Sequence, residues 1–278
     1  MIKSINLRDR RVLLRVDYNV PIEDGQVVDD YRIKKTLPTL RYCLDQGASI
    51  TIMSHLGRPN GVDENLSLSP VCDILSKLLG KEIIFSEDCI SDKALVTSSS
   101  LNKGQIHMLE NLRFHGGELT NDKDFSRMLS FHGDVYINDA FGTAHRSHAS
   151  NVGVVDFFDE YCMGLLMKRE LKYLIDEIKN PINPFVVVMG GAKVKGKIEL
   201  IENLLNISDK LLIGGALSFP FLKVIGVDIN SPLLNNEDIE CAKKILSIAK
   251  ESNKEIILPT DFVTSTSLED IDNIDIKL

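Results

Sequence analysis

The sequence predicts an α/β protein in which parallel sheets are covered by helices. Short apolar runs rich in β-branched residues alternate with longer stretches of helical periodicity along most of the 278 residues. A helix that connects two neighbouring strands of one sheet makes those strands parallel. Each strand, helix and following strand therefore indicates a βαβ unit.

The predicted elements fall into two sets. In the first set the strands are residues 11–16, 49–54, 82–85, 106–109 and 134–138, and the helices are 32–46, 69–79 and 125–130. In the second set the strands are residues 185–189, 210–213 and 255–258, and the helices are 197–205 and 236–251. Ser69 with Pro70, and Asn236 with Asp238, are favourable residues for starting a helix.

A long helical stretch separates the two sets, at about residues 164–179, and Pro181 and Pro184 follow it. We therefore expect an N-terminal domain at residues 1–163, a bridging helix at 164–180 and a second domain at 181–278. The tail, residues 264–278, has weak periodicity and many acidic residues. We interpret it as an incomplete secondary-structure element and not as the end of a domain.

Composition excludes several classes of protein. The net charge of −8 argues against a general nucleic-acid binder, although it permits a local basic cleft. The cysteines are scattered without a C-x-x-C spacing, which favours buried thiols in a reducing compartment. The N-terminus lacks the apolar core of a secretory signal, and no apolar run reaches membrane-spanning length. We expect a cytoplasmic protein without nucleic-acid or membrane partners.

Candidate anion ligands follow the strands of the first set. They are Asp17 and Asn19, then His55 and Arg58, then Arg113, then His145, Arg146 and His148, with Arg32 at the head of the first long helix. Because parallel strands bring their carboxyl ends to one edge, these side chains should gather there. Guanidinium groups bind phosphate and carboxylate, and Asp or Asn can bind hydroxyls. The pattern predicts a site for a small phosphorylated hydroxy acid.

Two histidines in this group, His145 and His148, have a spacing that could suit a metal ion. No nearby cysteine or glutamate completes a zinc set, and the intervening Arg146 would oppose a cation. We therefore expect no metal ligands among these residues.

In the second set a glycine turn follows the strand at 185–189. Gly190 and Gly191 lead to Lys193 and Lys197 at the start of a helix, an arrangement that can bind phosphate through backbone N–H groups and the helix dipole. A solvated basic turn is the alternative. A P-loop NTPase is disfavoured because Ile198 stands where a P-loop has the Ser or Thr that binds Mg²⁺.

Several of these segments together resemble the phosphoglycerate kinase family, over nearly the whole chain. Residues 15–21 (RVDYNVP) resemble its RVDFNVP signature, with Tyr18 in place of Phe, and residues 29–33 (DDYRI) resemble its DDxRI segment. Residues 53–59 (MSHLGRP), 109–114 (LENLRF) and 138–146 (NDAFGTAHR) match three further motifs. Residues 190–197 (GGAKVKGK) resemble the motif on the nucleotide side.

The resemblance implies two Rossmann-like domains joined by a bridging helix. The first would bind 3-phosphoglycerate, and the second would bind ADP or ATP with Mg²⁺. The reaction would be reversible phosphoryl transfer from 1,3-bisphosphoglycerate to ADP, a step of glycolysis, carried out by a monomer. The family's substrate ligands fall on Asp17, Asn19, His55, Gly57, Arg58, Arg113 and Arg146, its transfer residues on Arg32 and Lys193, and its nucleotide ligands on Gly191, Lys197, Gly214 and Gly215.

The sequence also departs from the family. Ala216 stands where many members have a third glycine, and Ser218-Phe219-Pro220 replaces a commoner small, polar continuation. The later WNGPxG and GGGD motifs, which carry a carboxylate for the nucleotide ribose and the Mg²⁺-binding aspartate, do not occur. We therefore expect a truncated family member with an incomplete second domain. Two hypotheses remain, a kinase and a remnant that binds 3-phosphoglycerate without transferring phosphate.

Overall fold

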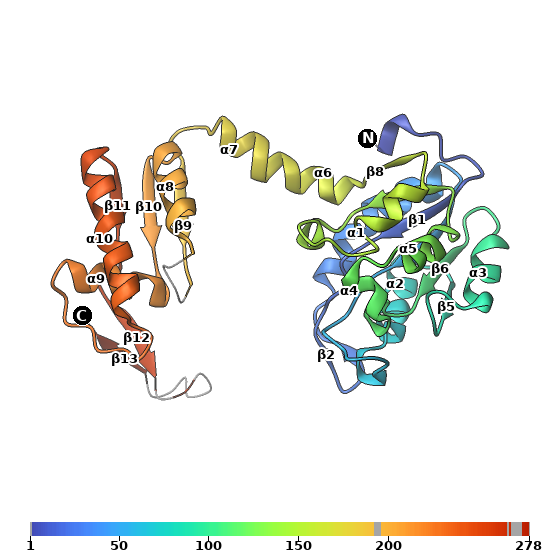
Figure 1. The fold of residues 1–278 in the computed structure, drawn as a ribbon, viewed down its shortest axis with the longest axis horizontal. Helices are drawn as coiled ribbons and strands as arrows, with labels where there is room; N and C mark the ends of the chain where they lie inside the picture. The colour runs from blue at the N-terminus through green and yellow to red at the C-terminus, as the bar shows by residue number, and fades with distance from the viewer. Residues whose placement is uncertain (1, 192–195, 266, 268–273, 278) are drawn as a thin grey trace. The chain divides into compact units, whose positions relative to one another are not determined.

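The computed structural model describes residues 2–191, 196–265, 267 and 274–277 (Figure 1). These residues form two compact units, Met1–Leu174 and Ile175–Leu278, and each is described by itself. The division falls within a run of helical segments: α6 (Leu165–Leu171), a π-helical turn (Lys172–Asp176) and α7 (Glu177–Lys179). The predicted helix at 164–180 is thus helical over most of its length, and the domain boundaries at 163 and 181 stay a proposal.

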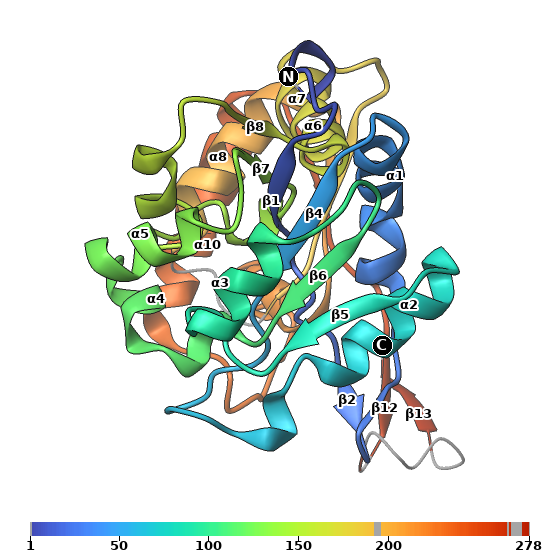
Figure 2. The same cartoon turned by 90° about the vertical axis from the view of Figure 1, so that its right-hand side faces the viewer.

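Unit 1 is built on a six-stranded parallel sheet with the strand order β5-β6-β4-β1-β7-β8 (Figure 2). Its strands are β1 (Arg11–Arg15), β4 (Ser49–Met53), β5 (Ile83–Ser86), β6 (Ile106–Leu109), β7 (Val135–Asn138) and β8 (Tyr161–Met163). The central strands are in register, so that Leu13 lies between Thr51 and Tyr136. All five strands predicted for this part are confirmed to within about one residue, and the short edge strand β8 was not predicted.

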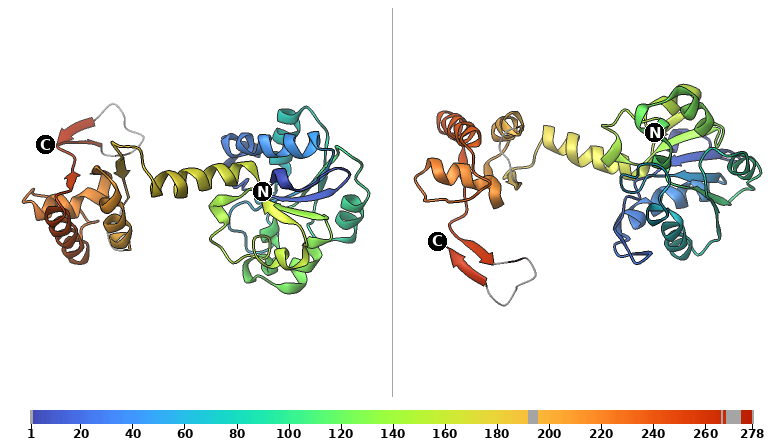
Figure 3. Two further views of the ribbon diagram at one scale, coloured as in Figure 1. Left: turned by 90° about the horizontal axis from the view of Figure 1, so that it is seen from above. Right: turned by 60° about the horizontal axis from the view of Figure 1, so that its bottom comes forward.

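Helices cover both faces of this sheet. They are α1 (Tyr31–Asp45), α2 (Ser69–Leu79), α3 (Asp92–Ser99), α4 (Gly116–Thr120) and α5 (Lys123–Ser130), and a small hairpin, β2 (Ile22–Glu23) and β3 (Gln26–Val27), precedes α1. Seen from above, α1 and the pair α4 and α5 lie on opposite sides of the sheet (Figure 3). Helix α2 begins at Ser69 with Pro70, as predicted, and ends where Gly80 adopts the left-handed conformation.

The alternation of side chains along each strand produces two cores. Val12 and Leu14 face one core, to which α1 and α2 contribute Leu40 and Leu75. Leu13 faces the other core, together with residues of α3 and α5 such as Leu129. Both faces of β1 are therefore buried, which explains the apolar run Val12–Leu14 in its middle.

Unit 2 contains a three-stranded parallel sheet with the order β11-β10-β9. Its strands are β9 (Val186–Met189), β10 (Lys210–Ile213) and β11 (Glu255–Ile257), and its helices are α8 (Ile198–Ile207), α9 (Phe219–Val224) and α10 (Asn236–Glu251). Residues of the helices pack on β10 and form the core of this unit. The tail forms an antiparallel hairpin of β12 (Phe262–Ser265) and β13 (Ile274–Lys277), which the sequence did not predict.

No helix in the described part of the chain is long and apolar enough to cross a membrane.

Candidate functional site

The site of unit 1 lies at the carboxyl edge of its sheet, where the strand order reverses. From β1 the chain continues to β4 on one side, and it later returns to β7 on the other side of β1. Loops that leave neighbouring strands in opposite directions open a crevice, which is the usual ligand position in such sheets. The loop after β1 carries Asp17, and the loop after β7 carries Asp139 to Gly142.

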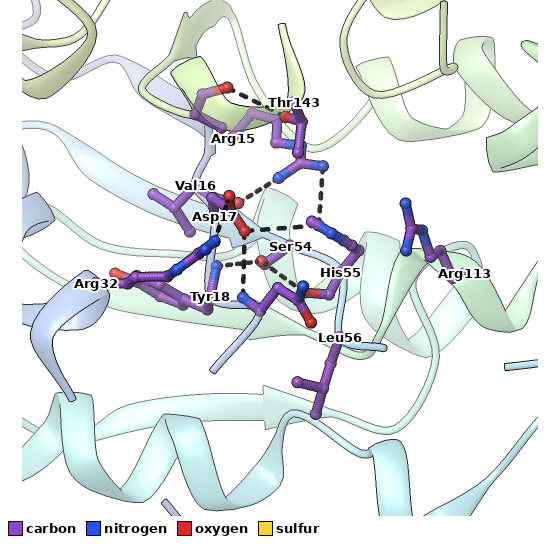
Figure 4. Close-up of polar contacts among 12 residues, drawn as sticks. Arg15, Val16, Asp17, Tyr18, Arg32, Ser54, His55, Leu56, Arg113 and Thr143 are labelled. Atoms are coloured by element: carbon purple, nitrogen blue, oxygen red, sulfur yellow. Dashed lines mark hydrogen bonds and ion pairs between the residues drawn. The ribbon is translucent and has the colours of Figure 1, made fainter. Parts of the chain in front are cut away.

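Asp17 is the centre of a polar group formed by two loops and a helix (Figure 4). Its Oδ2 accepts a hydrogen bond from Nη1 of Arg32, at the start of α1, over 2.7 Å. Asn19 turns toward the loop after β4, and its Oδ1 accepts a hydrogen bond from the backbone N–H of Gly57 over 2.9 Å. Asp17 and Arg32 line a cavity of about 230 Å³ together with Tyr31, Lys35, Thr36, Asp139, Ala140, Phe141, Gly142, Leu166 and Glu170.

The loop after β7 is held in place by the buried carboxylate of Asp139. Its oxygens accept hydrogen bonds from the Thr39 hydroxyl over 2.5 Å and from the backbone N–H of Met167 over 2.9 Å. Burial raises the pKa of Asp139. Asp139 thus fixes the start of α6 against the end of β7.

A second cavity of unit 1 is lined mainly by basic residues. Its volume is about 400 Å³, and its lining residues are Arg58, Pro59, Arg113, Leu119, Arg146 and His148. Among the described residues, no acidic side chain forms an ion pair with any of its three arginines. Such a cluster of guanidinium groups suits an anion with several oxygens, such as a phosphate.

Arg113 shows how this cluster is constructed. The side chain is 7% exposed and donates from Nη1 to the carbonyl of Gly57, while Nε is buried without a partner in the described part of the chain. Burial, and then the positive charges of Arg146 and Arg15, lower its pKa. A buried donor without a partner is energetically unfavourable.

Behind the cations lies a buried network that the sequence did not reveal. Arg15 is 0% exposed, and its Nε donates to the Ser150 hydroxyl over 3.2 Å. Ser150 donates from its hydroxyl over 2.7 Å and from its backbone N–H over 2.9 Å to Glu118, which is also 0% exposed. Glu118 lies 3.6 Å from Nδ1 of His148. The carboxylate of this network, Glu118, is therefore buried and is not among the residues that line the cavity, whose charged lining residues are basic.

The structure links Asp17 to Arg32 and Asn19 to Gly57, and it places Arg58, Arg113 and Arg146 around one cavity. His145 is exposed and lines neither cavity. Gly57 joins Asn19 to Arg113 through its backbone and has a φ of +61°, a conformation that favours glycine. His55 is 2% exposed and contacts Arg15. Arg15 directly follows the apolar run Val12–Leu14, whereas nothing in the sequence around Glu118 indicates burial.

In unit 2 the predicted nucleotide ligands lie at the carboxyl ends of β9 and β10. Gly214 donates its N–H to the carbonyl of Met189 over 2.8 Å, which joins the two strand ends. Gly191 and Gly215 have φ values of +152° and +62°. Lys197 extends back to the first turn, with its Nζ 3.3 Å from the position that a Cβ of Gly191 would take. Lys193 lies outside the described residues.

Metal-binding side chains are not clustered in the described ranges, since no group of three or more His, Cys, Asp or Glu could hold an ion there. His148, one of the two histidines at metal-like spacing, lines the arginine cavity instead.

Comparison with known proteins gives a consistent result. The family model for phosphoglycerate kinase matches residues 2–277. The phosphoglycerate kinase of Chloroherpeton thalassium is 44% identical over 269 residues, which are 96% of this chain and 68% of that protein. The enzyme of Thermosipho africanus is 44% identical over 280 residues, 99% of this chain and 69% of that protein.

Solved structures agree with this similarity. The phosphoglycerate kinase of Coxiella burnetii has a TM-score of 0.81 at 35% identity, over 99% of this chain and 70% of that one. The enzyme of Pyrococcus horikoshii OT3 has a TM-score of 0.82 at 32% identity, over 94% of this chain and 67% of that one.

Proposed function

The chain belongs to the phosphoglycerate kinase family, and we propose on this basis that unit 1 binds 3-phosphoglycerate and unit 2 binds ADP or ATP. The family's kinases are glycolytic enzymes that transfer a phosphoryl group reversibly between 1,3-bisphosphoglycerate and ADP. The acceptor in the direction of ATP use is the carboxyl group of 3-phosphoglycerate.

The observation that carries the proposal is the presence of the arginine cavity and the Asp17 cavity in unit 1. The 3-phosphate would lie between Arg58, Arg113 and Arg146 and would accept a hydrogen bond from the unpartnered Nε of Arg113. Asp17 and Asn19 would bind the glycerate hydroxyl. The carboxylate would then point toward Arg32, at the far side of Asp17.

Phosphoryl transfer to or from an acyl phosphate needs no covalent nucleophile, because the group is already activated. The protein has to align two anions and neutralise their repulsion by positioned charges. Arg32 fits this task because it is held by Asp17 at the cavity and keeps donors available for a second partner. We assign the same task to Lys193, on its match to the family motif.

The nucleotide phosphates would lie on the glycine turns of unit 2. Gly191, Gly214 and Gly215 have no side chain to block the approach of a phosphate, and Lys197 supplies a cation beside Gly191. Kinases of this family generally use ADP and ATP with Mg²⁺, which neutralises phosphate charge. The described residues contain no group of three or more His, Cys, Asp or Glu that could hold Mg²⁺.

Calorimetric titration of the 278-residue chain with 3-phosphoglycerate tests the proposal. We expect a dissociation constant in the micromolar to millimolar range, and binding at least tenfold weaker in Arg146→Met, since a hydrogen bond to a charged group contributes about 1.5–3 kcal/mol. Arg127→Met, which removes an arginine from α5 outside the cavity, is the matched control. Absence of binding by the folded chain would overturn the proposal.

A coupled assay for ATP formation from 1,3-bisphosphoglycerate separates the kinase from a remnant that only binds 3-phosphoglycerate. We further propose that the chain is a cytoplasmic monomer with small-molecule partners. Light scattering should then give a mass near 31.0 kDa at all concentrations.

A further inference from the structure

We propose that Arg15 is a positioning residue, which holds His55 as a neutral imidazole with its proton on Nε2, so that His55 donates a hydrogen bond to the substrate. This inference rests on the proposed function for the identity of the substrate. The tautomer itself follows from contacts within unit 1 and can be tested without any ligand.

Arg15 is fixed from three sides at the end of β1. Its Nε donates to the Ser150 hydroxyl, its Nη1 donates to the carbonyl of Val16, and its Nη2 lies 3.3 Å from Nδ1 of His55. Ser150 in turn donates to Glu118, so the acceptor of the Nε bond is itself anchored. The guanidinium therefore points one N–H at His55 with little freedom to turn away.

An arginine has five donors and no acceptor, so the nitrogen of His55 that faces it has to accept. A neutral imidazole has one accepting and one donating nitrogen. With Nδ1 accepting from Arg15, the proton is placed on Nε2. The other neighbour of Nδ1 is Asp17, whose Oδ1 is 4.0 Å away, too far to accept a hydrogen bond that would hold the proton on Nδ1.

The electrostatic surroundings exclude the doubly protonated form. Burial, and then the charges of Arg15, Arg113, Arg146 and His148, lower the pKa of His55 to about 2. The carboxylate of Asp17, at 4.0 Å, is the acidic group nearest to the ring. The lowered pKa favours the neutral imidazole at neutral pH, so that His55 adds no positive charge to the site.

The two nitrogens of His55 consequently have different neighbours. Figure 4 shows Arg15 and Asp17 on one side of His55 and Arg113 on the other side. Nε2–H has no hydrogen-bond partner among the described residues and remains available for an oxygen of the ligand. Arg15 therefore acts on the substrate through His55 and not by direct contact.

The tautomer can be measured directly by ¹⁵N NMR of the histidine side chains in the ligand-free chain. Comparison with His55→Gln assigns the resonances. We expect the Nδ1 of His55 to show a lone-pair shift and Nε2 to carry the proton, without titration between pH 8 and pH 5. A protonated Nδ1, or an imidazolium in this range, would overturn the inference whether or not the chain binds 3-phosphoglycerate.

Two amide variants test the direction of the hydrogen bond. The amide N–H₂ of Gln can take the place of Nε2–H, whereas that of Asn takes the place of Nδ1. We expect His55→Gln to bind 3-phosphoglycerate about tenfold more tightly than His55→Asn, the effect of one hydrogen bond of about 1.4 kcal/mol. The opposite order, with both proteins folded, would contradict a donor at Nε2.

Variants of Arg15 separate positioning from a merely structural role. Arg15→Met keeps much of the volume without donors, and Arg15→Lys restores one donor. We expect His55 to populate both neutral tautomers in the methionine variant and to return to the Nε2–H form in the lysine variant. Arg11→Met, at the other end of β1, should leave the resonances of His55 unchanged. An unchanged His55 spectrum in folded Arg15→Met would refute the proposal. If that variant does not fold, the wild-type spectrum and the two His55 variants still decide.

Discussion

Acid should destabilise unit 1 strongly through a pair of buried histidines, His107 and His132. Both are 0% exposed. The Ser98 hydroxyl joins them, at 2.8 Å from Nδ1 of His107 and 2.6 Å from Nδ1 of His132. The far nitrogens lie 2.7 Å from the Ser86 hydroxyl and 2.9 Å from the Cys89 carbonyl.

These partners fix which group donates and which accepts in each of the hydrogen bonds that link Ser86, His107, Ser98, His132 and Cys89. The carbonyl of Cys89 only accepts, so His132 has its proton on Nε2 and accepts at Nδ1 from Ser98. The Ser98 oxygen then accepts from Nδ1–H of His107, and Nε2 of His107 accepts from Ser86. Both imidazoles are neutral in this arrangement, which agrees with the depressed pKa of each.

The loss of unfolding free energy on acidification follows from proton linkage. Burial is the main cause that lowers the pKa of both histidines from 6.5 to about 4. The folded state therefore binds fewer protons than the unfolded state between these values, and stability is lost as the pH falls from about 6.5 to about 4. Between pH 7 and pH 5 each histidine accounts for about 2 kcal/mol, and the pair for about 4 kcal/mol. That is a large part of the 5–15 kcal/mol typical of a domain.

Urea unfolding at pH 7 and pH 5, followed by circular dichroism, measures this loss. The double variant His107→Gln, His132→Gln should be less stable at pH 7 but should lose about 4 kcal/mol less than wild type on acidification. His145→Gln, which replaces an exposed histidine, should behave like wild type. Equal pH dependence in the double variant and in wild type would show that protonation of these two histidines does not drive the acid destabilisation.

Further expectations concern the substrate cavities and the start of α6. In a chain that shows turnover, Arg32→Ala should raise the activation barrier for kcat by on the order of 3 kcal/mol and should leave the affinity for 3-phosphoglycerate almost unchanged. A raised KM at unchanged kcat would contradict a role of Arg32 in phosphoryl transfer. Arg113→Ala should chiefly weaken 3-phosphoglycerate binding, which calorimetry can measure. Gly164→Ala should destabilise unit 1 by about 1–3 kcal/mol because its Cβ would lie 2.2 Å from an oxygen of Asp139, whereas Gly116→Ala meets nothing within 4 Å and should be neutral in thermal unfolding.

The sequence predicted the sheets well because their strands are apolar on both faces. Residues 11–15, 49–53 and 106–109 are buried almost throughout, and their apolar and β-branched residues marked them as strands although each also contains polar residues such as His107. Helix α3 was not predicted because its sequence, DKALVTSS, is short and weakly amphipathic. The hairpin of β12 and β13 was also missed, since its pairing depends on contact between two segments that are separately uninformative.

In the candidate site, too, some residues could be predicted from the sequence and others could not. Loop residues such as Asp17, Arg58 and Arg113 could be predicted, because polar side chains after successive parallel strands must share one edge. The burial of Arg15 and Glu118 could not be predicted, because a charge is stable inside a protein only with partners that lie far away in the sequence. Those partners become visible only in the folded chain.

A crystal structure of the 278-residue chain with bound 3-phosphoglycerate would show directly which unit holds the substrate. We predict the phosphate between Arg58, Arg113 and Arg146, with the hydroxyl at Asp17 and the carboxylate toward Arg32. A ligand bound only at the glycine turns of unit 2, with none in the arginine cavity of unit 1, would contradict a substrate site in unit 1.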